Sequence, residues 1–199
     1  MIRKVLSVVA LLGGGILLVY SLFSLYQQQN IGKQSEQAVR QVMKETEESE
    51  MDSGTVVYKK RPQKGEKVGE LVIPRLNAVL PIIEGAKEEE LSRGVGHMME
   101  TVLPGENDMS VLAGHRDTVF RHVGQLEAGD ELVVQTDEGH FLYHIEKTWI
   151  TDKDDRSVIH SVQEPILLLI TCYPFEYIGS APERYIIQAR LNPEIQRRR

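Results

Sequence analysis

The chain has 199 residues and a net charge of −6, and its apolar share of 41% is ordinary for a folded domain. This length allows one domain or two small ones. The acidic balance disfavours a nucleic-acid-binding protein, which usually carries a basic face. The single cysteine excludes an intramolecular disulfide and a cysteine-based zinc site, and no EF-hand-like loop appears, so we predict no metal site.

Residues 1–26 have the pattern of a cytoplasmic stub followed by a transmembrane anchor. No charged side chain occurs from Val5 to Tyr26, and about 20 apolar residues suffice to cross a hydrocarbon core as a helix. Arg3 and Lys4 precede this segment, which predicts a cytoplasmic N-terminus and an extracellular domain. A cleaved signal peptide is the alternative, but its apolar region would be shorter and would end in a small-x-small site, which is absent here.

Residues 27–69 are predicted to form a polar stalk and linker. Within 33–53, apolar residues recur at helical spacing, which is compatible with a short amphipathic helix, although the acidic composition favours a stalk. Glycines and a proline stand among lysines over 54–69, a composition typical of a linker.

Residues 70–192 are predicted to form a mainly β domain, followed by a basic tail over 193–199. The expected strands cover 71–73, 78–83, 110–113, 131–136, 141–145, 165–170 and 184–191, with a short helix at 87–93. Prolines restrict the first two strands to sheet ends or edges. The continuous apolar run at 165–170 predicts a strand buried on both faces. Short strands that follow one another closely indicate a closed barrel or a sandwich.

Cys172 is the first candidate for chemistry. It follows the apolar run at 165–170 and Thr171, where the chain emerges from a predicted strand. A free cysteine is most often a small buried hydrophobic residue, and that reading is the alternative. A lone thiol outside the cell meets oxidants, however, so its presence suggests a use.

His115 and Arg184 are the candidates that could support a reactive thiol. A thiolate usually needs a nearby histidine or cation, and His115 follows an apolar strand and Gly114. Arg184 opens the last predicted strand, and a guanidinium offers a charged, planar set of donors for a thiolate or an oxyanion. The alternatives are a surface histidine and a solvated charge at a strand end. None of the three residues is decisive alone.

The combination of these residues resembles the sortases, the membrane-anchored cysteine transpeptidases of Gram-positive bacteria. The similarity covers about residues 68–191 and includes, in family order, Leu71-Val72-Ile73-Pro74, Leu112-Ala113-Gly114-His115-Arg116-Asp117-Thr118, Leu169-Ile170-Thr171-Cys172-Tyr173-Pro174-Phe175 and Ala181-Pro182-Glu183-Arg184-Tyr185. One departure is Leu168, where the family's Thr-Leu-x-Thr-Cys pattern begins with threonine. The Thr-Cys-Tyr-Pro-Phe motif, together with the Ala-Pro-x-Arg-Tyr that follows, is most similar to class D.

The resemblance implies an eight-stranded sortase-type β-barrel with short helices. It also implies that Cys172 is the nucleophile, His115 the general acid/base and Arg184 the oxyanion or substrate clamp. The substrate would be a secreted protein with a C-terminal sorting signal of the Leu-Pro-x-Thr-Gly or Leu-Pro-x-Thr-Ala type, cleaved after threonine. An amine of peptidoglycan or of its lipid-linked precursor would accept the protein, and no cofactor is implied.

Two other functions remain possible from the sequence. A different cysteine enzyme, such as a wall-directed thiol protease, would share Cys172 and His115 but release its product to water. A non-catalytic, membrane-anchored binding module would contain Cys172 incidentally, and its function would survive replacement of that residue.

Overall fold

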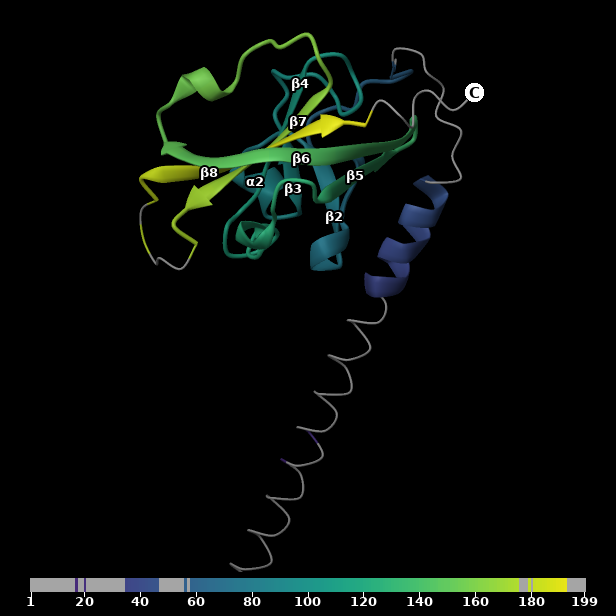
Figure 1. Ribbon diagram of the computed structural model, residues 1–199, viewed down its shortest axis with the longest axis horizontal. Helices are drawn as coiled ribbons and strands as arrows, with labels where there is room; N and C mark the ends of the chain where they lie inside the picture. The colour runs from purple at the N-terminus through teal and green to yellow at the C-terminus, as the bar shows by residue number, and fades with distance from the viewer. Residues whose placement is uncertain are drawn as a thin grey trace, which may run out of the picture. The chain divides into compact units, whose positions relative to one another are not determined.

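The computed structural model in Figure 1 describes residues 17, 20, 35–46, 56, 58–175, 179 and 181–192. Almost all of the predicted anchor at 1–26, and the whole of the predicted tail at 193–199, lie outside these residues. Within the described ranges, no helix is both long enough and apolar enough to cross a membrane. The chain divides into a unit over 1–37 and a unit over 38–199, and the second contains the β domain.

Eight strands close into a barrel in the order β1-β2-β3-β4-β7-β8-β6-β5. Their bounds are β1 (Lys67–Ile73), β2 (Ala78–Glu84), β3 (Val95–His97), β4 (Met109–Ala113), β5 (Glu131–Thr136), β6 (Gly139–Asp152), β7 (Ile166–Tyr173) and β8 (Glu183–Leu191). A helix spans 35–46, and the helices within the β domain are short: α2 (Glu88–Leu91) and three 3-10 turns at Pro74–Leu76, Val123–Gln125 and Arg156–Val158. Neighbouring strands are antiparallel except for β2–β3 and β4–β7. The expected mainly β, eight-stranded barrel is confirmed.

Strand β7 is buried on both faces, as its continuous apolar run predicts. Leu167 and Leu169 point into the barrel core. Ile166 and Leu168 point outward and join a second cluster with residues of β4 and β8. Val158 and Val162, from the connection between β6 and β7, pack against this outer cluster. The β6–β7 connection therefore covers part of the outer face of β4, β7 and β8.

A helix over 35–46 replaces part of the predicted stalk. Its Val39 and Val42 are buried against Val72 and Val133 on the outer face of the barrel. The prediction of a stalk was therefore wrong for residues 38–46, because the apolar residues at helical spacing find an apolar strand face to bury.

The barrel also begins earlier than the boundary predicted at residue 70. Strand β1 starts at Lys67. Tyr58 is buried in the barrel core, and its hydroxyl donates a hydrogen bond to the Pro104 carbonyl at 2.7 Å. Part of the predicted linker thus belongs to the folded domain, since a phenol ring contributes substantial apolar area even within a polar sequence.

Two smaller features of the barrel differ from the sequence prediction, and the edge position of Pro81 agrees with it. Strand β3 was not predicted, because three residues with a central glycine carry no recognisable pattern. The expected helix over 87–93 is shorter and spans Glu88–Leu91. Pro81 lies inside β2 rather than at its end. At that position β2 is paired with β1 but not yet with β3, whose pairing begins at Ile82, so proline is tolerated at an open edge.

Candidate active site

The barrel places the three candidate residues at the same end of neighbouring strands. Strands β4, β7 and β8 are adjacent, and Ala113 of β4 lies opposite Ile170 of β7. His115 and Cys172 each follow two residues after this pair. Cys172 is the register partner of Arg184 on β8. The strand register therefore brings together residues that are far apart in the sequence.

Cys172 and Arg184 project from the outer face of the barrel. Side chains alternate along a strand, and Leu169 of β7 and Ile187 of β8 lie in the core. Cys172 and Arg184 are three residues away from these two, so both belong to the opposite, outward face. Directly opposed residues of antiparallel strands have Cβ atoms about 4.5–5.5 Å apart. The thiol and the guanidinium are therefore within mutual reach beside the outer apolar cluster.

Hydrogen bonds fix the position of His115 relative to β7. The Gly114 amide donates to the Ile170 carbonyl at 3.1 Å, and the Thr171 hydroxyl donates to the Gly114 carbonyl at 2.8 Å. A Cβ atom at Gly114 would lie 2.6 Å from the Phe120 ring. Close packing against Phe120 thus explains the glycine before His115.

His115 faces a pocket that also contains a carboxylate from α2. Its imidazole is 33% exposed, and Nε2 lies 3.5 Å from Oε1 of Glu88. The pocket has a volume of about 490 Å³ and is lined by Pro81, Glu88, Leu91, Ser92, Arg93, Gly94, His115, Asp117, Thr118 and Val119. The sequence analysis did not identify Glu88. No local pattern indicates that a glutamate in α2 lies beside a histidine that follows β4.

Two nearby backbone carbonyl oxygens hold the half-buried guanidinium of Arg184. Nη1 donates to the carbonyl oxygens of Ala181 and Glu183, at 3.2 Å and 2.9 Å. Within the described part of the chain, the Nη2 and Nε atoms of Arg184 make no hydrogen bond to another residue. The Cys172 thiol is free and half-buried.

Arg116 forms hydrogen bonds with the segment that follows Cys172. Its Nη1 donates to the Pro174 carbonyl at 2.8 Å, and its Nη2 donates to the Gly179 carbonyl at 2.9 Å. Aromatic rings of Tyr173 and Phe175 pack edge to face with centroids 5.5 Å apart on the same segment. Sequence reasoning singled out the histidine but not the arginine beside it, which links the β4 end to the β7–β8 connection.

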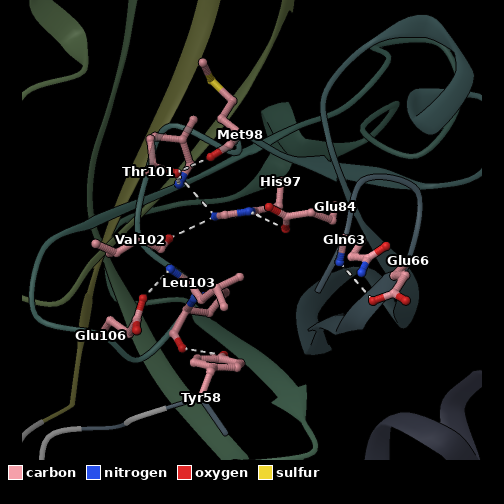
Figure 2. Close-up of polar contacts among 12 residues, drawn as sticks. Tyr58, Gln63, Glu66, Glu84, His97, Met98, Thr101, Val102, Leu103 and Glu106 are labelled. Carbon is pink, nitrogen blue, oxygen red and sulfur yellow. Dashed lines mark hydrogen bonds and ion pairs between the residues drawn. The ribbon is translucent and has the colours of Figure 1, made fainter. Parts of the chain in front are cut away.

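A buried polar network lies at the ends of β2 and β3 (Figure 2). His97 is 1% exposed and Glu84 is 6% exposed. The His97 Nδ1 atom lies 2.8 Å from Oε2 of Glu84, and its Nε2 lies 2.9 Å from the Val102 carbonyl. One hydrogen-bonded histidine thus joins β2, β3 and the loop that leads to β4. No local sequence pattern predicts this role of His97, because strand pairing brings its partner Glu84 beside it.

No metal centre is evident in the described ranges. Among these residues, no group of three or more histidine, cysteine or acidic side chains is arranged to hold a metal ion.

The fold and this arrangement agree with comparisons to known proteins. The family model for the sortase domain matches residues 71–192. Sortase D of Bacillus subtilis strain 168 is 50% identical over 133 residues, which are 65% of this chain and 66% of that protein. The match therefore spans slightly less than two thirds of this relative.

Solved structures give the same result. A Sortase D5 transpeptidase of Clostridium perfringens has a TM-score of 0.61 and 28% identity, covering 66% of this chain and 82% of that one. The catalytic domain of Bacillus anthracis SrtD has a TM-score of 0.58 and 46% identity, covering 70% and 97%. The chain belongs to the sortase family of cysteine transpeptidases. Its relatives include sortases of class D.

Proposed function

We propose that this chain is a class D-like sortase that cleaves a sorting signal of the Leu-Pro-x-Thr-Gly or Leu-Pro-x-Thr-Ala type after threonine and transfers the protein to an amine. The observation that carries the proposal is the placement of His115, Cys172 and Arg184 at one end of three neighbouring strands. The apolar outer face beside them, covered in part by the β6–β7 connection, supports an extended, largely apolar signal as the donor.

The first half of the reaction forms a thioester on Cys172. The thiolate attacks the threonine carbonyl, and the oxyanion that develops accepts hydrogen bonds from the Nη2 and Nε atoms of Arg184. His115, as imidazolium, gives its proton to the leaving amine as the carbon–nitrogen bond breaks. Cys172 then carries the acyl group, and His115 is neutral.

The second half transfers the acyl group to an amine of peptidoglycan or of its lipid-linked precursor. The amine attacks the thioester and the carbon–sulfur bond breaks, while His115 takes a proton from the nucleophile. Thiolate and imidazolium are thereby regenerated. The alternative function, a thiol hydrolase, uses the same first half but lets water resolve the thioester.

The predicted anchor at residues 1–26 supports a location at the cell membrane, with a cytoplasmic N-terminus and an extracellular catalytic domain. Secreted precursor and lipid-linked acceptor would then meet the enzyme at one membrane surface. Such tethering raises effective concentration without adding any contact.

The proposed transfer is tested by product analysis with the purified full chain in detergent. Peptides that end in the two signals are incubated with and without a small amine, and the products are identified by mass spectrometry. We expect cleavage after threonine and an amide product that appears only when the amine is present. Cleavage with hydrolysis alone, at every amine concentration, would favour the thiol hydrolase.

Arg184 is predicted to depend on its planar set of donors as well as on its charge. We expect Arg184→Ala to lower the rate of thioester formation about 10²–10³-fold, the range for loss of an oxyanion donor. Arg184→Lys should recover less than a tenth of this loss, because a single ammonium cannot contact the carbonyls of Ala181 and Glu183 and the oxyanion together. Recovery to the wild-type rate by lysine would show that only charge matters.

A further inference from the structure

The pocket beside His115 carries an exposed negative charge at its mouth. Of its charged lining residues, Arg93 directs Nη1 to the Gly65 carbonyl at 2.9 Å, whereas Glu88 is 83% exposed and approaches Nε2 of His115 at 3.5 Å. Asp117 is also exposed on this pocket. The charged lining of this pocket thus includes two exposed carboxylates and one exposed guanidinium, and Glu88 is the carboxylate that lies beside His115.

Glu88 differs from the two glutamates that follow it in α2. Glu90 is buried, and its carboxylate accepts the Lys87 amide hydrogen and lies 3.3 Å from Lys64. Glu89 lies 4.0 Å from the same lysine. Among the described residues, the Glu88 carboxylate forms an ion-pair contact with His115 alone. Glu88 is thus the glutamate of α2 whose carboxylate lies beside the imidazole of His115.

We propose that this pocket is the entry site of the acceptor and that Glu88 binds its ammonium group, which makes Glu88 a specificity-determining residue for cationic amines. This inference rests on the function proposed above. A primary amine is mostly protonated at neutral pH, so the acceptor arrives as a cation. To react, it must reach the thioester next to His115, the base that takes its proton. A carboxylate 3.5 Å from Nε2 of His115 holds the cation at that place.

The nitrogen of the bound ammonium carries three protons and loses two of them during transfer. It first releases one proton to solvent at the open mouth of the pocket and becomes the free amine. Its nitrogen forms the bond to the acyl carbon as the bond to Cys172 sulfur breaks. The second proton passes to His115, and the amide product keeps the third. Glu88 is unchanged by the reaction, and water as a nucleophile makes no use of its charge.

The test compares two nucleophiles on the full chain in detergent, with Glu88→Gln as the variant and Glu89→Gln as the matched control. Glu89 is one residue away, has the same charge and is 81% exposed. Glycyl-glycinamide supplies a single ammonium group, and hydroxylamine is uncharged at neutral pH. For each nucleophile, the rate of transfer from a Leu-Pro-x-Thr-Ala peptide is measured against nucleophile concentration, and hydrolysis is measured without nucleophile.

We expect Glu88→Gln to raise the KM for glycyl-glycinamide about three- to five-fold, the size expected for loss of one exposed charge interaction. Its KM for hydroxylamine should change less, so the ratio of the two KM values should rise about three- to five-fold relative to wild type, whereas Glu89→Gln should keep the wild-type ratio. Equal KM values for glycyl-glycinamide in all three proteins, or hydrolysis without any transfer to this amine in wild type, would overturn the inference. Failure of wild type to cleave the peptide would instead contradict the proposed function.

Discussion

Replacing His115 by alanine is expected to lower the rate of thioester formation about 10²–10⁴-fold, the usual contribution of a positioned general acid. The leaving amine would have to depart without a proton donor, and Cys172 would lose the base that forms its thiolate. The strand geometry supports this role, since hydrogen bonds at Gly114 hold the residue before His115 against β7. The measurement is the single-turnover rate of acylation by a sorting-signal peptide, followed by quenched mass spectrometry.

His144→Gln is the control for this prediction. His144 lies on β6 opposite Arg190, at the other end of β8 from Arg184, and its Nε2 contacts the Asn192 amide at 3.1 Å. Its replacement should leave the acylation rate unchanged. An acylation rate in His115→Ala within three-fold of wild type would contradict the assigned role of His115.

Replacing His97 by alanine is expected to destabilise the barrel by about 1–3 kcal/mol, the cost of leaving a buried polar group without its hydrogen-bond partner. The carboxylate of Glu84, 6% exposed, would lose its 2.8 Å contact in a site with little access to water. The Val102 carbonyl would lose its donor as well. The measurement is urea denaturation of the full chain in detergent.

Two further variants separate this explanation from a simple loss of packing. The double replacement Glu84→Leu with His97→Leu removes both polar partners and should recover at least half of the lost stability, because neither side chain then leaves a polar group buried without its partner. Lys67→Ala breaks an exposed ion pair with Glu70 and should cost less than about 1 kcal/mol. A double variant as unstable as His97→Ala would show that packing, not the unpaired carboxylate, explains the loss.

Most of the barrel follows from local sequence patterns. Two short runs separated by a turn predicted β5 and the start of β6, and the continuous apolar run predicted β7 with both faces buried. In contrast, β3 has three residues and depends on its neighbours β2 and β4 for its conformation. The helix over 35–46 had the right spacing of apolar residues, but its partners on the outer face of the barrel are not visible in the sequence.

The site was predictable only where a motif identified it. His115, Cys172 and Arg184 were candidates by residue type and position, the resemblance supplied their roles, and the strand register explains why they lie together. The contacts of Glu88 with His115 and of Glu84 with His97 join residues from different elements. Neither contact has a local signal, because each depends on how strands pair across the barrel.

The central claim is that Cys172 forms a thioester with the sorting signal, and intact-mass spectrometry tests it most directly. The full chain is mixed with Leu-Pro-x-Thr-Gly and Leu-Pro-x-Thr-Ala peptides, quenched in acid and weighed beside Cys172→Ala. The account predicts an adduct equal to the peptide truncated after threonine, present in wild type and absent in the variant. Cleavage of the peptide by Cys172→Ala at the wild-type rate, or no adduct and no cleavage by wild type with either peptide, would contradict it.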